Sequence, residues 1–197
     1  MTTPKLVLLA GANGAGKSTL AAKLPDLVGD VAFLNADDVA RTLQPNDVEA
    51  VALAAARTVI RRREELLKSR ASFCVETTLA TLTLLGFVSR ANSDDYLTRL
   101  IFLFTPSPTV NEFRVKQRVM QGGHNIDTDT IRRRHALGLK YLPRYLEVCR
   151  EAIILDARTS STREVLRKED DKISVADAAD AEILRASIRA AGGSTSF

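Results

Sequence analysis

The most constraining feature of the sequence is the stretch KLVLLAGANGAGKSTL, which runs from residue 5 to residue 20. Residues 6–10 are apolar and are followed by glycine, as in a short buried strand. The segment from Gly11 to Ser18 matches the pattern G-x-x-x-x-G-K-[ST] at every fixed position, and a helical pattern follows from Thr19. A strand, a glycine-rich turn and a helix in this order predict a phosphate-binding loop. We therefore expect the chain to bind a nucleoside triphosphate.

Each part of this loop has a physical role. Glycines let the backbone turn tightly, so that successive N–H groups point inward and form a site for an anion. Lys17 is expected to reach the β- and γ-phosphates of ATP or another nucleotide, and the Ser18 hydroxyl to ligate Mg²⁺. The loop residues predicted to bind the nucleotide are Gly11, Ala12, Asn13, Gly14, Ala15, Gly16, Lys17, Ser18 and Thr19. The alternative is a chance glycine-rich turn, which the match at every fixed position disfavours.

Short apolar runs alternate with helical patterns along most of the chain. Strands are expected at 31–34, 72–75, 99–104 and 152–155, with helices over 20–24, 47–70, 80–90, 110–121 and 128–148. This alternation is typical of an α/β protein whose parallel sheet, here of about five strands, is flanked by helices.

The C-terminal part has a different pattern. Residues 165–168 and 172–175 predict a polar hairpin, and a helix is expected over 178–190, so residues 162–191 are expected to form a small C-terminal hairpin and helix beside the parallel sheet. The sequence contains no internal repeat and no linker that would divide it. A single domain over residues 1–197 is therefore expected.

Charge and composition limit the classes of partner. The net charge is +4, but the segment 110–150 alone holds nine Lys or Arg residues against four acids, an excess of +5. This local cluster suits bound phosphates as well as a nucleic-acid face. Aromatic residues make up only 5% of the chain and Trp is absent, so a base-stacking surface for nucleic acid is not expected. No signal segment or membrane span is predicted, which favours the cytoplasm.

Two strand ends carry candidate catalytic groups. Asp37 and Asp38 follow the strand at 31–34, and Glu76, Thr77 and Thr78 follow the strand at 72–75, at the edge where ligands bind in open parallel sheets. A kinase needs a carboxylate to accept the proton of the acceptor hydroxyl, and Asp37 is the preferred base. Asp38 is a helix cap or a substrate ligand, and the Glu-Thr-Thr run is a substrate site or a cap.

A helix with two arginines precedes a glycine-rich turn. Arg114 and Arg118 are four residues apart, and this like-charge pair is favourable only with an anion between them. The following Gly122-Gly-His124 stretch suggests that residues 110–135 form a lid over the triphosphate. The remaining candidates are His124, Arg133 and Arg134 for the substrate, and Arg158 for the nucleotide.

Cys74 and Cys149 are far apart and lie among apolar neighbours, so buried free thiols are expected.

Taken in order, these motifs resemble the zeta-toxin-like P-loop kinases. The resemblance rests on GANGAGKST, NADD, ETTL, R-V-x-x-R-V-x-x-G-G-H-x-I and IRRRH, over roughly residues 5–160. It implies an NTP-dependent kinase with Lys17 and Ser18 at the phosphates and metal, Asp37 as base, Glu76 at the substrate and Arg118 at the transferring phosphate. It also implies UDP-N-acetylglucosamine as acceptor and an antitoxin partner. The lid is short, and Ile126-Asp127 stands where relatives often have Val-Pro.

The leading expectation is a P-loop NTPase-type fold that transfers the γ-phosphate to a hydroxyl of a small metabolite, such as a nucleotide sugar. An antibiotic or polyol kinase of similar build is the alternative within the same class. A nucleotide-binding switch and a nucleic-acid-end kinase are alternatives from other classes, and they differ in phosphate transfer and in the salt dependence of oligonucleotide binding.

Overall fold

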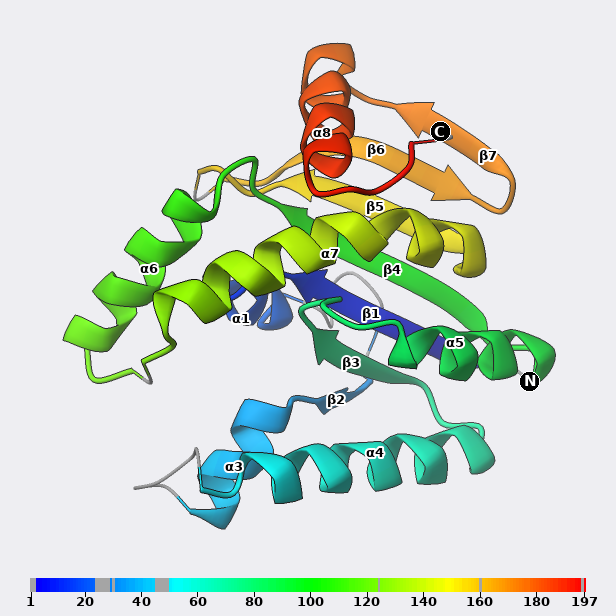
Figure 1. Cartoon of the computed structure of the whole chain (residues 1–197). Coiled ribbons are helices and arrows are strands. Elements are labelled where there is room, and N and C mark those ends of the chain that lie inside the picture. Colours follow the sequence, from blue (N-terminus) through cyan, green and yellow to red (C-terminus); the bar gives the residue numbers. More distant parts are fainter. Residues whose placement is uncertain are drawn as a thin grey trace.

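A computed structural model describes residues 3–23, 29, 31–44, 50–123, 125–159, 161–195 and 197. Within these residues, seven strands form one sheet in the order β2-β3-β1-β4-β5-β6-β7 (Figure 1). The strands are β1 (Lys5–Gly11), β2 (Ala32–Leu34), β3 (Phe73–Thr77), β4 (Leu97–Phe104), β5 (Glu151–Asp156), β6 (Arg163–Glu169) and β7 (Lys172–Val175). The first five are parallel, which confirms the predicted α/β P-loop fold.

Helices lie on both faces of this sheet. They are α1 (Lys17–Ala21), α3 (Ala36–Leu43), α4 (Ala52–Lys68), α5 (Thr83–Ser93), α6 (Pro108–Met120), α7 (Thr128–Val148) and α8 (Ala178–Ala190). In Figure 1, α5 and α7 cross one face of the sheet, and α8 lies beside β6, near the edge formed by the last two strands. The expected bounds of α7 and α8 are confirmed at both ends.

The core is divided by the sheet because side chains of a strand alternate between its faces. On one face Leu6 and Leu8 of β1 pack with residues of α5, α7 and α8 in the larger cluster. On the other face Val7 and Leu9 join Cys74 of β3, with Leu20 of α1 packed against them. The centre of β1 is thus covered on both sides, and its C-terminal end opens directly into the glycine-rich loop.

The predicted hairpin is part of the sheet rather than a separate addition. β6 pairs antiparallel with β5, from Asp156 opposite Arg163 to Glu151 opposite Glu169, and β7 extends the edge. The expectation of about five strands therefore holds for the parallel part, and the hairpin increases the total to seven.

The helices α4 and α5 are joined by an ion pair between Glu64 and Arg90 at 2.6 Å. Cys74 and Cys149 are both free and buried, as predicted. None of the helices in the described part of the chain is long and apolar enough to cross a membrane.

Candidate functional site

The glycine-rich loop takes a conformation that its glycines make accessible. Gly16 has φ of +99° and directly precedes α1, and Gly14 has φ of +78°. A Cβ on Gly14 would lie 2.5 Å from the carbonyl oxygen of Asn111 in α6. The loop is therefore packed against α6 too closely for any side chain at this position.

Lys17 is buried within the loop, with only 6% of the residue exposed. Its ammonium group donates hydrogen bonds to the carbonyl oxygens of Gly11 at 2.9 Å and Ala12 at 3.0 Å. It also lies 3.6 Å from Oε1 of Glu76 at the end of β3. The two strand ends are adjacent because Leu9 of β1 pairs in register with Glu76.

Burial shifts the pKa values of this pair in opposite directions, because it disfavours the charged form of each group. It lowers the pKa of Lys17, and Glu76 and Asp37 counteract part of that shift. It raises the pKa of Glu76, where the charge of Lys17 opposes the shift and the carboxylates of Asp37 and Asp38 add to it. Each member of the pair thus depends on the other to remain charged.

The helix after β2, α3, begins before Asp38, the residue that was expected to cap a helix. Asn35 is its N-cap and accepts a hydrogen bond from the Asp37 amide at 2.8 Å. The interpretation of Asp38 as the cap is therefore wrong, because an asparagine one turn earlier already satisfies the helix end. Asp38 instead forms an ion pair with Arg41. Asn35 also donates to Glu76 Oε2 at 3.0 Å, which joins the ends of β2 and β3.

These groups line a cavity of about 750 Å³, which we call the phosphate cavity. Asp37, Asp38 and Glu76 line it beside Lys17, Ser18 and Thr19, and Arg114 and Arg118 of α6 complete it. Acidic groups at two strand ends are thus brought together with the loop and with two arginines from a distant part of the sequence.

Arg118 is held at this cavity by the turn that follows α6. The amide of Gly123 donates to the carbonyl oxygen of Arg118 at 2.9 Å. A Cβ on Gly123 would lie 2.6 Å from Cγ of Arg118 and 2.8 Å from its carbonyl oxygen. The glycine therefore permits a close turn that the Arg118 side chain packs against.

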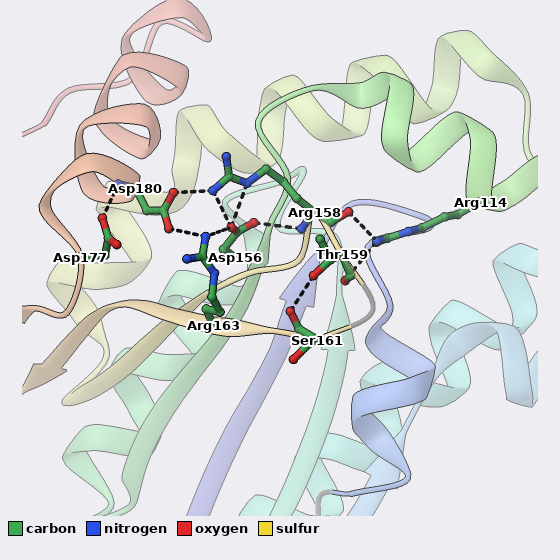
Figure 2. Close-up of polar contacts among 8 residues, drawn as sticks. All are labelled: Arg114, Asp156, Arg158, Thr159, Ser161, Arg163, Asp177 and Asp180. Carbon is green, nitrogen blue, oxygen red and sulfur yellow. Dashed lines mark hydrogen bonds and ion pairs between the residues drawn. The ribbon is translucent and has the colours of Figure 1, made fainter.

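Arg114 connects α6 with two loops. It donates to the carbonyl oxygens of Arg158 at 3.1 Å and Thr159 at 3.2 Å, and to that of Gly14 at 3.5 Å. The phosphate-binding loop and the segment after β5 are thus bridged by one guanidinium group (Figure 2 shows the contacts with Arg158 and Thr159).

A second cavity of about 750 Å³ shares lining residues with the first, and we call it the nucleoside cavity after the ligand that we propose for it below. Gly16, Thr19 and Arg114 line both cavities. Its other walls are α6, with Val110 and an exposed Phe113, and the segment after β5. The remaining lining residues are Ala15, Leu20, Lys23, Thr109, Gln117, Ala157, Arg158, Thr159 and Thr162.

The loop is also held by a buried polar network that the sequence analysis missed. Asn111, which is fully buried, donates to the carbonyl oxygen of Asn13 at 3.0 Å and accepts from the Thr105 hydroxyl at 2.7 Å. His135 Nε2 lies 2.7 Å from the Thr105 carbonyl, which can only accept, so this nitrogen donates. Burial lowers the pKa of His135, which favours the neutral ring.

A signal for this network exists in the sequence. Asn111 and Val115 are four residues apart and share the buried face of α6. A polar residue on the apolar face of a helix needs a hydrogen-bond partner, which points to a structural or functional contact.

The other predicted site residues have different surroundings. Arg134 donates to Asn13 Oδ1 at 3.1 Å, so it reaches the phosphate-binding loop. Arg133 is exposed and lines neither cavity, whereas Arg132 joins α7 to α6 through Glu112 at 2.7 Å. His124 lies outside the described residues.

The two threonines after Glu76 are used by the turn that leads to α5. Thr77 Oγ1 accepts from the Leu79 amide at 3.1 Å, and Leu79 has φ of +54°. The carbonyl oxygen of Thr78 would lie 2.8 Å from a Cβ on Gly138 of α7. Glu76 lines the phosphate cavity, and neither threonine does.

The donors in the phosphate cavity fit a magnesium ion held together with nucleotide phosphates. Within the described part of the chain, no group of three His, Cys, Asp or Glu residues is arranged to hold a metal by itself. Mg²⁺ is commonly bound by one or two protein oxygens and by substrate phosphates. The Ser18 hydroxyl, which is exposed at the start of α1, is a hard oxygen donor of this kind.

Comparison with known proteins agrees with this fold. Residues 6–138 match the family model described as an AAA domain. Over 131 residues the chain is 28% identical to an uncharacterized protein of Haemophilus influenzae. This match covers 66% of this chain and 92% of that protein.

Similar solved structures include the AvrRxo1-ORF1:-ORF2 complex with ATP, with a TM-score of 0.71 and 16% identity. That match covers 92% of this chain, which spans 63% of the length of the AvrRxo1 chain. The PezAT chromosomal toxin–antitoxin system of Streptococcus pneumoniae matches with a TM-score of 0.67 and 17% identity, over 96% of this chain and 86% of that chain. At these identities the comparison establishes the P-loop fold.

Proposed function

The chain belongs to the AAA domain family, and from this premise we propose that it is a kinase that transfers the γ-phosphate of ATP to a hydroxyl group of a small metabolite. The observation that carries the proposal is the phosphate cavity, in which Lys17 and Arg118 lie with the carboxylate of Asp37. Cations that stabilise a transferring phosphoryl group and a base for the attacking hydroxyl are the two requirements of this reaction.

We place the nucleoside in one cavity, and the triphosphate and the acceptor in the other. We assign the nucleoside to the nucleoside cavity, where Val110 and the exposed ring of Phe113 supply apolar surface. The triphosphate extends past Gly16, which lines both cavities, into the phosphate cavity. The acceptor occupies the remaining part of the phosphate cavity, beside Asp37.

The proposed reaction is a direct displacement at the γ-phosphorus. The acceptor oxygen forms a bond to this phosphorus while the bond to the β,γ-bridging oxygen breaks, and ADP leaves. Asp37 accepts the proton of the hydroxyl. Lys17 moves from its carbonyl partners to the phosphates, and Arg118 stabilises the negative charge on the transferring group.

A magnesium ion would neutralise part of the triphosphate charge. The residue that would hold it is Ser18, through its hydroxyl. The Glu76 carboxylate is paired with Lys17 at 3.6 Å.

For the acceptor we propose a nucleotide sugar, with UDP-N-acetylglucosamine as the first compound to test. A substrate with its own diphosphate needs cations beyond those that serve ATP. Arg134 reaches Asn13 of the loop, so one arginine lies near the loop in addition to Lys17, Arg114 and Arg118, which serve ATP. A polyol without phosphates would not need it. Of the residues predicted to bind the substrate, Asp38 and Glu76 line the cavity.

An antitoxin protein is the proposed macromolecular partner. The support is the likeness in fold to the PezAT toxin–antitoxin system, over 96% of this chain. Co-expression with the product of a neighbouring open reading frame, followed by co-purification, tests this part of the proposal.

Phosphate transfer from γ-labelled ATP to a panel of acceptors tests the proposed reaction. The panel contains UDP-sugars, free sugars, aminoglycoside and chloramphenicol-type antibiotics and 5′-hydroxyl oligonucleotides. Labelled UDP-sugar supports the full proposal. Transfer only to antibiotics or free sugars supports the proposed kinase activity and contradicts the proposed nucleotide-sugar acceptor. Transfer only to oligonucleotides identifies a nucleic-acid-end kinase. ATP binding without any transfer favours a nucleotide-binding switch.

A further inference from the structure

Figure 2 shows an ion-pair network that joins the C-terminal helix α8 to Arg158, a residue that lines the nucleoside cavity. Its acids are Asp156 at the end of β5 and Asp180 in the first turn of α8, which are 4% and 6% exposed. Its bases are Arg158 in the segment after β5 and Arg163 at the start of β6. The network lies outside residues 6–138, which match the family model.

The contacts in the network are reciprocal. Arg158 contacts both carboxylates, with 2.7 Å to Asp156 and a shorter contact to Asp180. Arg163 also contacts both, at 3.3 Å to Asp156 and 2.9 Å to Asp180. Two acids and two bases thus neutralise each other, and removal of one acid leaves an excess positive charge beside a buried carboxylate.

The network fixes the backbone that lines the nucleoside cavity. The Arg158 amide donates to Asp156 Oδ1 at 2.9 Å, so the chain turns directly after β5. This turn presents the carbonyl oxygens of Arg158 and Thr159 to Arg114, and both residues line the nucleoside cavity. Asp180 itself lines neither cavity and is connected to them through Arg158.

We infer that Asp180 is a positioning residue for nucleotide binding, through which α8 holds the segment after β5 against the nucleoside. This inference rests on the proposed function, since it concerns the nucleoside part of the same site. It assigns to the C-terminal hairpin and helix a role in the affinity for ATP. It also changes the expected role of Arg158, whose guanidinium is engaged by two carboxylates instead of being directed at the triphosphate.

A change at Asp180 should affect the binding of the nucleoside part of ATP and the binding of its triphosphate part differently. Loosening of the segment after β5 weakens contacts with the nucleoside, whereas the phosphate-binding loop is held by Asn111 of α6 and by Arg134 of α7. An isosteric change at Asp180 should therefore reduce the affinity for ATP and leave the affinity for inorganic triphosphate unchanged. A general loss of structure would reduce both.

Isothermal titration calorimetry with ATP and with inorganic triphosphate tests this in the full chain. We expect Asp180→Asn to raise the Kd for ATP by about three- to thirtyfold and to leave the Kd for triphosphate within twofold of the parent value. Arg163→Gln should likewise raise the Kd for ATP and leave the Kd for triphosphate unchanged. The side chain of Arg163 is 61% exposed, so this variant replaces Asp180→Asn in the test if Asp180→Asn does not fold. Glu182→Gln is the matched control, because Glu182 lies on α8 and pairs only with Arg185 and Arg189 among the ion pairs described.

The outcomes separate this inference from the proposed function. Parent protein that binds ATP, with Asp180→Asn and Arg163→Gln equal to the parent, overturns the inference and leaves the kinase proposal standing. Equal loss of ATP and triphosphate affinity in both variants also overturns it, as does tighter ATP binding. Parent protein that does not bind ATP overturns both.

Discussion

The ammonium nitrogen of Lys17 lies 3.6 Å from a carboxylate oxygen of Glu76, and only 6% and 13% of these two side chains are exposed. A lysine predicted to serve the phosphates is thus part of a buried ion pair between the start of α1 and the end of β3. Because a buried charge without a partner is costly, the pair has consequences for stability as well as for catalysis.

Lys17→Ala should destabilise the fold by roughly 1–3 kcal/mol, because it leaves the Glu76 carboxylate buried without its cation. Replacement of Glu76 by Gln in the same chain should restore part of this loss. Urea denaturation of the parent, the single variant and the double variant measures the effect. Lys23→Ala, at an exposed position, is the control and should change stability by less than about 0.5 kcal/mol. A double variant no more stable than Lys17→Ala would contradict the prediction.

Asp37→Asn should reduce turnover by roughly 10²–10⁴-fold, which is the usual contribution of a general base. The Kd for ATP should remain close to the parent value, because the carboxylate acts on the acceptor hydroxyl. Asp38→Asn is a matched control, since Asp38 lines the same cavity but is paired with Arg41. Steady-state kinetics distinguish the two, and a severe loss in Asp38→Asn with a mild one in Asp37→Asn would reverse the assignment.

Arg118→Ala should lower kcat more than it raises the KM for ATP, because the charge on the transferring group is greatest in the transition state. Gly123→Ala should reproduce part of this loss, since its Cβ would lie 2.6 Å from Arg118 Cγ and would displace that side chain. Gly86→Ala is the control, because a Cβ there has no heavy atom within 4 Å. A parent-like kcat in Gly123→Ala would show that the position of Arg118 does not depend on this close turn.

The two cysteines should be unreactive in the folded protein. Burial raises the pKa of both Cys74 and Cys149 to about 12, so at pH 8 roughly one thiol in 10⁴ is the reactive thiolate. Alkylation at pH 8 followed by mass spectrometry should find both unmodified in the native protein and both modified in urea. Rapid modification of either thiol without denaturant would mean that it is accessible.

The parts of the fold that depend on local pattern could be predicted from the sequence. The phosphate-binding loop has a motif, and the bounds of α7 and α8 follow from the helical pattern of their residues, with Asp127 and Asp177 as the N-caps in the structure. The pairing of β6 with the edge of β5 depends on a partner strand and not on the hairpin's own residues. The sequence therefore predicted the hairpin but did not predict that it extends the sheet.

The site divides in the same way between local and distant contacts. Lys17, Asp37 and Glu76 could be found because they follow strands that end at one edge of the sheet. The contacts of Asn111 with Asn13 and of Arg158 with Asp180 join segments 98 and 22 residues apart, and no local pattern encodes either. The choice of Asn35 over Asp38 as the cap was missed because several residues in the NADD stretch are good caps.

The most direct test of the central claim is transfer of the γ-phosphate itself. Parent protein and Asp37→Asn are incubated with γ-labelled ATP, Mg²⁺ and UDP-N-acetylglucosamine, and the label is located by chromatography and mass spectrometry. The account predicts that the parent moves the label to the sugar nucleotide and that Asp37→Asn does so at least about a hundredfold more slowly. Label that remains in ATP or appears only as inorganic phosphate, with this acceptor and with every other member of the panel, would contradict it.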